Sequence, residues 1–219
     1  MDAEWKALYP DVAAAGSLGR AMAETAGRRG CDVGPIGPVP APVRVETDRG
    51  VVSVGLAAEE RLFLIGVHTP GFTWVTGSTD DLGLVVEAVA AWRDGLPLDD
   101  FEAKYPFMEL DEFARPLAAG DPAPLQWSRL LSSDFHADQR TLLTRLHEDE
   151  RLRLLFPTVT HGVVRLRVDP LDGGSRQFLV REVAPDRYQV DTVGGIKGAG
   201  ATVPTADLVA HLRNLQGER

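Results

Sequence analysis

The chain has 219 residues, 44% of them hydrophobic and 25% charged. This composition is globular and supplies enough apolar side chains for one large domain or two small ones. The formal net charge of -9 at pH 7 argues against a nucleic-acid partner, because non-specific binding needs basic surface. The sequence has no apolar run long enough to span a bilayer and no signal-peptide pattern, so we expect no membrane partner. The single cysteine, Cys31, cannot form an internal disulfide, which favours a cytoplasmic location.

The first half of the sequence predicts helices followed by strands. Ser17 is expected to cap a helix that runs to about Arg29, because its hydroxyl can accept a hydrogen bond from a free backbone N–H group. The glycine- and proline-rich segment 31–42 is typical of an irregular connection. Alternation of apolar and polar residues then predicts strands, joined by tight turns that imply antiparallel neighbours, over residues 43–46, 51–56, 62–67 and 72–76.

A helix after the fourth strand is the most clearly marked element. Ser78 or Thr79 is expected to cap it, and Gly95 is expected to end it. Apolar residues recur at spacings of three and four, which predicts one buried stripe made of Leu82, Val85, Val86, Val89 and Trp92.

The second half repeats the order of helices, strands and helix. Residues 96–120 predict two short helices, residues 121–124 a linker, and residues 134–156 a helix that Pro157 stops. Strands are expected at 161–168, 177–183 and 188–193, followed by a final helix capped by Thr205. The sequence therefore predicts an α+β fold of two similar units, 1–120 and 125–219, which could also form one continuous domain. Each unit is expected to have an antiparallel sheet of three or four strands with helices on one face.

The second predicted sheet carries the most informative polar pattern. If the hairpin pairs symmetrically about residues 169–175, one face is apolar, with Val164, Leu166, Val168, Phe178 and Val180. The next strand adds Tyr188 and Val190 to that face. The other face is polar, with His161, Arg165, Arg167, Gln177, Arg181, Gln189 and Asp191. Arginine side chains can hold a carboxylate or phosphate through two hydrogen bonds. We therefore take Arg165, Arg167, Arg181, Gln177 and Asp191 as candidate substrate-binding residues. Alternatively, this face packs against acidic residues of the first unit or is simply solvated.

His161 is the candidate acid–base residue, because it stands at the end of the arginine-rich strand and precedes a glycine that allows close backbone approach. The glycine-rich segment 194–200 could cradle a phosphate but departs from the known phosphate-loop pattern, and a plain loop is the simpler interpretation. Cys31 lies between a helix end and an acidic residue, which disfavours a reactive thiolate. No metal-ligand or cofactor motif is recognisable, so we predict neither a metal nor a cofactor.

Several short motifs resemble those of one bacterial family. They are Thr76-Gly77-Ser78-Thr79-Asp80-Asp81-Leu82, Ala91-Trp92-Arg93-Asp94-Gly95, Tyr105-Pro106-Phe107, and Leu152-Arg153-Leu154-Leu155-Phe156-Pro157 with Thr160-His161-Gly162. The family is an actinobacterial domain of unknown function labelled natural-product biosynthesis protein. The resemblance spans nearly the whole chain and implies a place in a biosynthetic gene neighbourhood. It carries over no catalytic residue.

Two functions follow as hypotheses. The first is an accessory protein of a natural-product pathway that binds a peptide, a carrier protein or a partner enzyme. The alternative is a cofactor-independent lyase or cyclase. In that case His161 is the acid–base residue, and Arg165, Arg167 and Arg181 hold an anionic small molecule.

Overall fold

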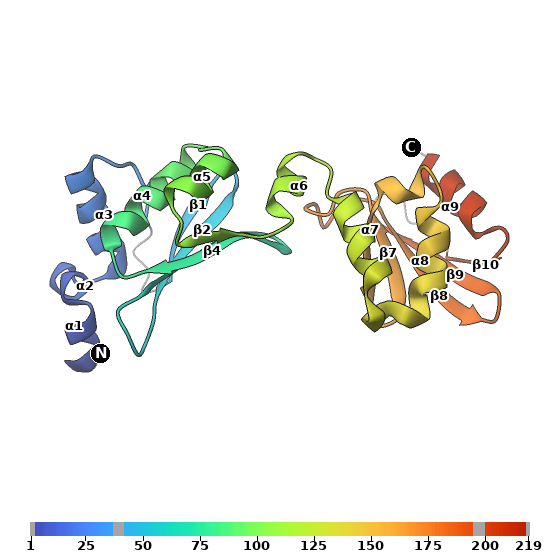
Figure 1. The fold of residues 1–219 in the computed structure, drawn as a ribbon, viewed down its shortest axis with the longest axis horizontal. Coiled ribbons are helices and arrows are strands. Elements are labelled where there is room, and N and C mark those ends of the chain that lie inside the picture. Colours follow the sequence, from blue (N-terminus) through green and yellow to red (C-terminus); the bar gives the residue numbers. More distant parts are fainter. Residues whose placement is uncertain (1–2, 37–41, 195–199, 218–219) are drawn as a thin grey trace. The chain divides into compact units, whose positions relative to one another are not determined.

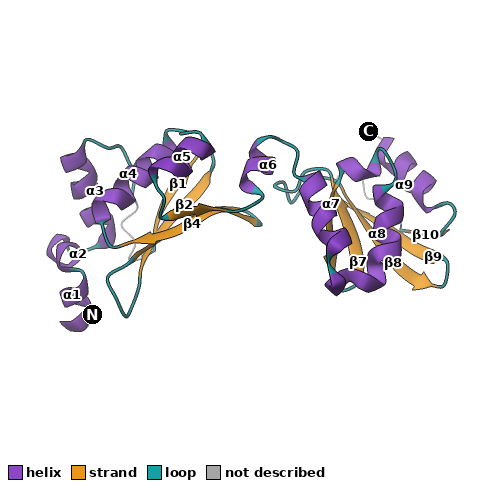
Figure 2. Cartoon of the chain, viewed as in Figure 1, coloured by secondary structure: helices purple, strands orange, loops and turns teal. Residues whose placement is uncertain are grey.

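The computed structural model describes residues 3–36, 42–194 and 200–217. Its internal contacts divide the chain into two compact units, Met1–Arg115 and Pro116–Arg219 (Figure 1). Each unit combines an antiparallel sheet with helices (Figure 2), so the predicted α+β fold class is confirmed. Both sheets have five strands, where the sequence predicted three or four.

The N-terminal unit has its strands in the order β1-β2-β3-β4-β5. Val45, Val52 and Val67 lie opposite one another on neighbouring strands and are buried, so this face of the sheet forms the core. The strands are β1 (Val43–Thr47), β2 (Gly50–Leu56), β3 (Phe63–Thr69), β4 (Phe72–Thr79) and β5 (Met108–Leu110). The helices are α1 (Ala3–Leu8), α2 (Pro10–Ala15), α3 (Leu18–Arg29), α4 (Leu82–Arg93) and α5 (Leu98–Lys104), and α6 (Ala114–Ala118) follows at the unit boundary.

Helix α4 buries all five residues of its predicted apolar stripe. Its predicted cap was wrong: β4 continues to Thr79, so Ser78 and Thr79 belong to the strand. Asp81 caps the helix instead, and its carboxylate accepts hydrogen bonds from the backbone N–H groups of Gly83 at 2.6 Å and Leu84 at 3.4 Å. The predicted cap of α3 is confirmed, because the Ser17 hydroxyl accepts from the Arg20 N–H.

Arginine–carboxylate pairs connect the elements of this unit. The guanidinium of Arg61 binds both carboxylate oxygens of Asp11 at 2.8 Å and also donates to the Leu8 carbonyl. Arg93 pairs with Asp32 at 2.6 Å. Arg29 pairs with Glu87, Arg115 pairs with Asp99 and Glu102, and these side chains are partly exposed, so each pair contributes modestly to stability.

The C-terminal unit has its strands in the order β10-β9-β8-β7-β6. Helices supply Trp127, Leu143 and Leu212 to a core that includes Leu166 and Phe178 on the covered face of the sheet. The helical segments are α7 (Ala123–Ser132), the 3₁₀ helix η1 (Asp134–Gln139), α8 (Arg140–His147), the 3₁₀ helix η2 (Leu152–Leu154) and α9 (Leu208–Gly217). The strands are β6 (Phe156–Thr160), β7 (Val163–Arg167), β8 (Gln177–Ala184), β9 (Arg187–Val193) and β10 (Ala201–Pro204).

The predicted helix 134–156 was wrong in its extent. Residues 134–154 form η1, α8 and η2, and Phe156 begins β6. Pro157 lies inside this strand, which is tolerated because β6 is at the edge of the sheet. Helix α7 starts within the predicted linker 121–124, and α9 starts at Leu208, three residues after its predicted cap, Thr205.

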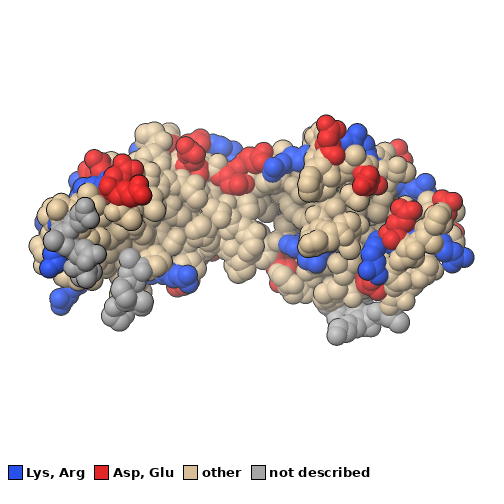
Figure 3. All heavy atoms as spheres, turned by 90° about the horizontal axis from the view of Figure 1, so that it is seen from below, with Lys and Arg blue, Asp and Glu red and all other residues tan. Residues whose placement is uncertain are grey.

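The two units differ in charge. Residues 1–115 contain 10 Lys and Arg against 19 Asp and Glu, whereas residues 116–219 contain 13 of each. The whole formal net charge of -9 therefore belongs to the N-terminal unit. On the face shown in Figure 3, acidic and basic side chains alternate over the C-terminal unit. The C-terminal unit of this acidic chain therefore has a formal net charge of zero.

Candidate functional site

The strand register confirms most of the polar pattern predicted for the second sheet. Val164 lies opposite Val180 and Leu166 opposite Phe178 on the buried face. The other face carries Arg165 opposite Leu179, Arg167 opposite Gln177, Arg181 opposite Gln189, and Asp191 opposite Leu179. We call this set of side chains, Arg165, Arg167, Gln177, Arg181, Gln189 and Asp191, the arginine face. Val168 was predicted wrongly as a core residue: it lies beyond the end of β7 and is 54% exposed.

The arginines of this face have no acidic partner among the described residues. No carboxylate in the described part of the chain pairs with Arg165, Arg167 or Arg181. Arg167 donates weakly to the Pro170 carbonyl at 3.4 Å, and its buried Nε has no partner among the residues described. Burial, and then the nearby charge of Arg165, lower the pKa of Arg167. Two neighbouring cations without a counterion attract an anion to this face.

Gln177 and Asp191 lie on the arginine face but are already engaged. Gln177 is buried, and its side-chain amide donates to the Gly173 carbonyl at 3.1 Å, which holds the loop between β7 and β8. Asp191 accepts a hydrogen bond from the Gln189 amide at 3.1 Å. Gly200 lies directly against Asp191, where any larger side chain would collide with the carboxylate. These residues shape the face, while no described carboxylate pairs with the guanidinium groups of Arg165, Arg167 and Arg181.

The sequence predicted that His161 begins a strand, and this was wrong. His161 lies in a turn. The turn His161-Gly162 joins the unpredicted strand β6 to β7, and both residues have positive φ, 51° and 76°. This is the pattern of a type I′ hairpin, in which glycine is favoured. The His161 side chain is exposed, and no described residue hydrogen-bonds or pairs with it. An acid–base residue is usually oriented by a second group, and the described residues supply none here.

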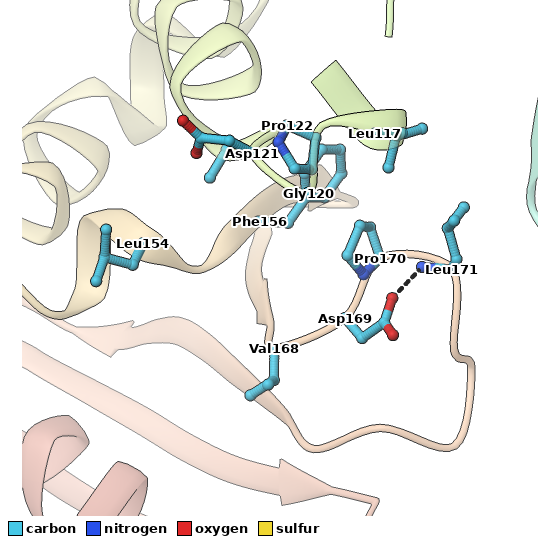
Figure 4. Close-up of a pocket in the computed structure, with 11 residues that line it drawn as sticks. Leu117, Gly120, Asp121, Pro122, Leu154, Phe156, Val168, Asp169, Pro170 and Leu171 are labelled. Atoms are coloured by element: carbon cyan, nitrogen blue, oxygen red, sulfur yellow. Dashed lines mark hydrogen bonds between the residues drawn. The ribbon is translucent and has the colours of Figure 1, made fainter. Parts of the chain in front are cut away.

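An apolar pocket adjoins the arginine face. It has a volume of about 480 Å³. In Figure 4, Pro170 and Leu171 of the loop after β7 lie opposite Leu117 of α6 and Pro122, which precedes α7. Two of the residues that line the pocket are exposed apolar side chains, Leu154 (70% exposed) and Val168.

The pocket is connected to the arginine face through the strand register. Phe156 lines the pocket and lies opposite Arg167, and Arg167 in turn contacts the Pro170 carbonyl. The loop that carries Pro170 is held by the Asp169 carboxylate, which accepts from the Leu171 N–H at 2.8 Å (Figure 4). A chain lying on the arginine face could therefore place an apolar side chain in the pocket. The sequence did not predict this pocket, because Leu154 was assigned to a continuous helix and Val168 to the core.

Other candidate chemistry receives no support from the described residues. Among them, no group of three His, Cys, Asp or Glu side chains is arranged to hold a metal ion. None of the described helices has both the length and the apolar character needed to cross a membrane. Residues 195–199 of the glycine-rich segment 194–200 lie outside the described residues, so neither the plain loop predicted there nor the alternative phosphate cradle is tested.

No family model, curated protein or solved structure matches this chain. The resemblance of its short motifs to the natural-product biosynthesis family therefore stays a prediction. A functional assignment has to be argued from the arginine face and its pocket.

Proposed function

We propose that this chain is a non-catalytic binding protein of a bacterial natural-product pathway, active in the cytoplasm, and that the arginine face recognises an acidic segment of a partner protein or peptide. The observation that carries the proposal is the row of arginines without carboxylate partners among the described residues. Arginine forks bind carboxylates bidentately, and such contacts are roughly twice as strong as neutral hydrogen bonds. The pathway context rests on the resemblance of the short motifs alone.

The apolar pocket supports the same proposal. Protein interfaces combine a few charged contacts with an apolar anchor in a pocket, and the anchor supplies most of the affinity. Phe156 and Val168 place such a pocket directly beside Arg167. An acidic segment that carries one large apolar residue would match both features.

The alternative function is a cofactor-independent lyase or cyclase that uses His161. It needs the imidazole to reach a substrate held by Arg165, Arg167 and Arg181. The exposed hairpin position of His161 favours binding over catalysis. A His161→Ala variant that abolishes product formation in the pathway, while binding of the partner is unchanged, would establish the enzyme instead.

The test of binding is a titration of this chain against each purified protein encoded beside its gene. Isothermal calorimetry should find one partner with micromolar affinity, and raising the salt concentration should weaken it, since the contacts are electrostatic. The double variant Arg165→Gln, Arg167→Gln should bind about tenfold or more weakly, because each lost charged hydrogen bond is worth roughly 1.5–3 kcal/mol.

The matched control is Arg151→Gln, which removes an exposed arginine of the same unit at the start of η2 that belongs neither to the arginine face nor to the lining of the pocket. It should bind like the unaltered protein. Equal affinities for the double variant and the unaltered protein would refute the assignment of the arginine face. Absence of micromolar binding to every neighbouring protein would refute the proposed function itself.

A further inference from the structure

The C-terminal unit contains a second, polar cavity on the covered side of its sheet. Its volume is about 310 Å³, at the lower end of the roughly 300–1,000 Å³ found for small-molecule sites. It lies between two helical segments and a hairpin: η1 contributes Asp138, α8 contributes Arg145, and the β8–β9 hairpin contributes Glu182, Asp186 and Tyr188. Thr205, after β10, closes it. The arginine face is on the opposite side of the same strands.

The register explains why polar groups gather at this end of the core. Phe178 and Val180 form the buried row of β8, and Glu182 is the next residue of that row. It lies opposite Tyr188 of β9, just before a register shift between Glu182 and Ala184. The apolar core therefore ends at a carboxylate beside a phenol.

The hydroxyl of Tyr188 has no hydrogen-bond partner among the described residues, and although the residue as a whole is only 8% exposed, the hydroxyl oxygen itself is not enclosed. The other two tyrosines of the chain are buried and satisfied. The Tyr9 hydroxyl lies 2.9 Å from the carbonyls of Ala57, Glu60 and Leu62, and that of Tyr105 donates to the Glu87 carbonyl at 3.0 Å. Tyr188 lines the cavity, so a ligand there can accept the hydrogen bond for which the protein supplies no partner among the described residues.

A second hydroxyl in the cavity is also unpartnered. The buried Oγ1 of Thr205 has no hydrogen bond to any described residue. The Thr205 backbone carbonyl accepts from one guanidinium nitrogen of Arg145 at 3.0 Å, which fixes the arginine beside it, and the other donors of Arg145 have no partner in the described part of the chain.

The charges around the cavity are of both signs and are not paired with one another. Arg145 is the cation, and Asp138, Glu182 and Asp186 are the carboxylates. No ion pair joins Arg145 to any of the three among the described residues. Burial raises the pKa of Tyr188, and Glu182 and Asp186 raise it further while Arg145 opposes them. Tyr188 is therefore protonated near neutral pH and can donate a hydrogen bond.

We propose that this cavity binds a small zwitterion, namely a free α-amino acid. Its carboxylate would meet Arg145 and the Tyr188 hydroxyl, and its ammonium group would meet Glu182 and Asp186. A simple anion would face three carboxylates, and a simple amine would face Arg145 without a counter-charge. Only a ligand with both groups a few ångströms apart satisfies both sides of the cavity.

The experiment is a binding screen of the intact chain against the twenty proteinogenic amino acids, by thermal shift and then by isothermal calorimetry. At least one amino acid should bind with a dissociation constant below about 1 mM, that is, by more than about 4 kcal/mol. The N-acetyl derivative and the decarboxylated amine of that amino acid should each bind at least about tenfold more weakly, because each lacks one charged contact.

Three variants connect binding to the cavity. Tyr188→Phe, which removes only an unpartnered hydroxyl, and Glu182→Gln should each weaken binding about tenfold. Arg140→Gln is the matched control, because Arg140 lies on the same helix as Arg145 but does not line this cavity, and it should bind normally.

Circular dichroism and the unfolding midpoint confirm that each variant is folded. The proposal is wrong if no amino acid binds below about 1 mM, if an amine or an acetylated amino acid binds as tightly as the zwitterion, or if folded Tyr188→Phe and Glu182→Gln bind like the unaltered protein. None of these results bears on the arginine face, which is tested separately.

Discussion

In the N-terminal unit, arginines reach carboxylates on other elements, as Arg61 does with Asp11 and Arg93 with Asp32. In the C-terminal sheet, Arg165, Arg167 and Arg181 have no such partner among the described residues. A lack of acidic residues does not explain why these arginines are unpaired, since residues 116–219 contain as many acidic as basic residues. The difference lies in placement. Arginines that tie elements together and arginines presented on a sheet face have different consequences for stability and for binding.

Substitution of Asp149 is expected to cause the largest loss of stability. This residue shows that the C-terminal unit also contains a paired carboxylate, in contrast to its unpaired arginine face. It is 6% exposed, pairs with Arg213, and accepts hydrogen bonds from the Arg151 and Leu152 N–H groups at 3.0 Å. Asp149→Ala should lower the free energy of unfolding by about 3 kcal/mol, because it breaks a pair with a buried member. Asp149→Asn should cost less, because its amide oxygen can still accept both backbone hydrogen bonds. Urea unfolding measures both, and equal losses would contradict a role for these backbone contacts.

Arg61 comes next in expected size. Arg61→Gln removes two hydrogen bonds to Asp11 and contacts to the carbonyls of Leu8 and Asp80. These side chains are about one third exposed, so we expect a loss of about 1–2 kcal/mol, in the range of charged hydrogen bonds reduced by solvent screening. A loss of unfolding free energy under about 0.5 kcal/mol, as for an ordinary surface substitution, would mean that the paired arginines of the N-terminal unit do not stabilise it.

The Asp11–Arg61 pair also predicts a dependence on pH. The hydrogen bond from Arg61 is the main cause that holds the pKa of Asp11 below its usual 3.8, against the opposing effect of burial. A lowered folded-state pKa gives stability that is present above the unfolded pKa and is lost as the pH falls through the folded value. Below about pH 4 the unaltered protein should therefore lose stability more steeply than Asp11→Asn. Parallel stability curves for the two proteins would contradict this account.

Arg167 should have the smallest effect on stability. Its guanidinium is partly buried next to Arg165, and both features lower its pKa. Arg167→Gln should thus be neutral or stabilising by up to about 0.5 kcal/mol, although the same change is expected to weaken binding of a partner. A large loss of stability would mean that Arg167 is a structural residue, as in the N-terminal unit.

Much of this architecture follows from residue patterns. Alternation predicted seven of the strands nearly in place, and the spacing of Leu82 to Trp92 predicted α4. Three strands were missed for physical reasons: β5 is only three residues long, and β6 and β10 are edge strands that contain Pro157 and Pro204, which usually interrupt strands. Helix α7 was missed because prolines at a helix start resemble a linker in sequence.

The arginine face was predictable because a strand places alternate residues on one side, so Arg165 and Arg167 had to share a face. The position of His161 was not, since it depends on β6 and the hairpin that β6 makes with β7. The polar cavity was beyond sequence reasoning as well. It requires knowing that Arg145 of α8 lies over the end of the β8–β9 hairpin, which is a matter of packing between distant segments.

The central claim is that the arginine face is unpaired and free to bind. It can be tested by NMR of the arginine Nε–H groups, recorded alone and with the partner found by calorimetry. We expect the signals of Arg165 and Arg181 to exchange rapidly with water in the free protein and to become protected and shifted in the complex. The signal of Arg167, whose Nε is buried, should shift on binding. The Nε–H of Arg61, which donates to the Asp80 carbonyl, should be protected throughout. Slow exchange of Arg165 and Arg181 in the free protein, or a response to the partner confined to the N-terminal arginines, would contradict the account.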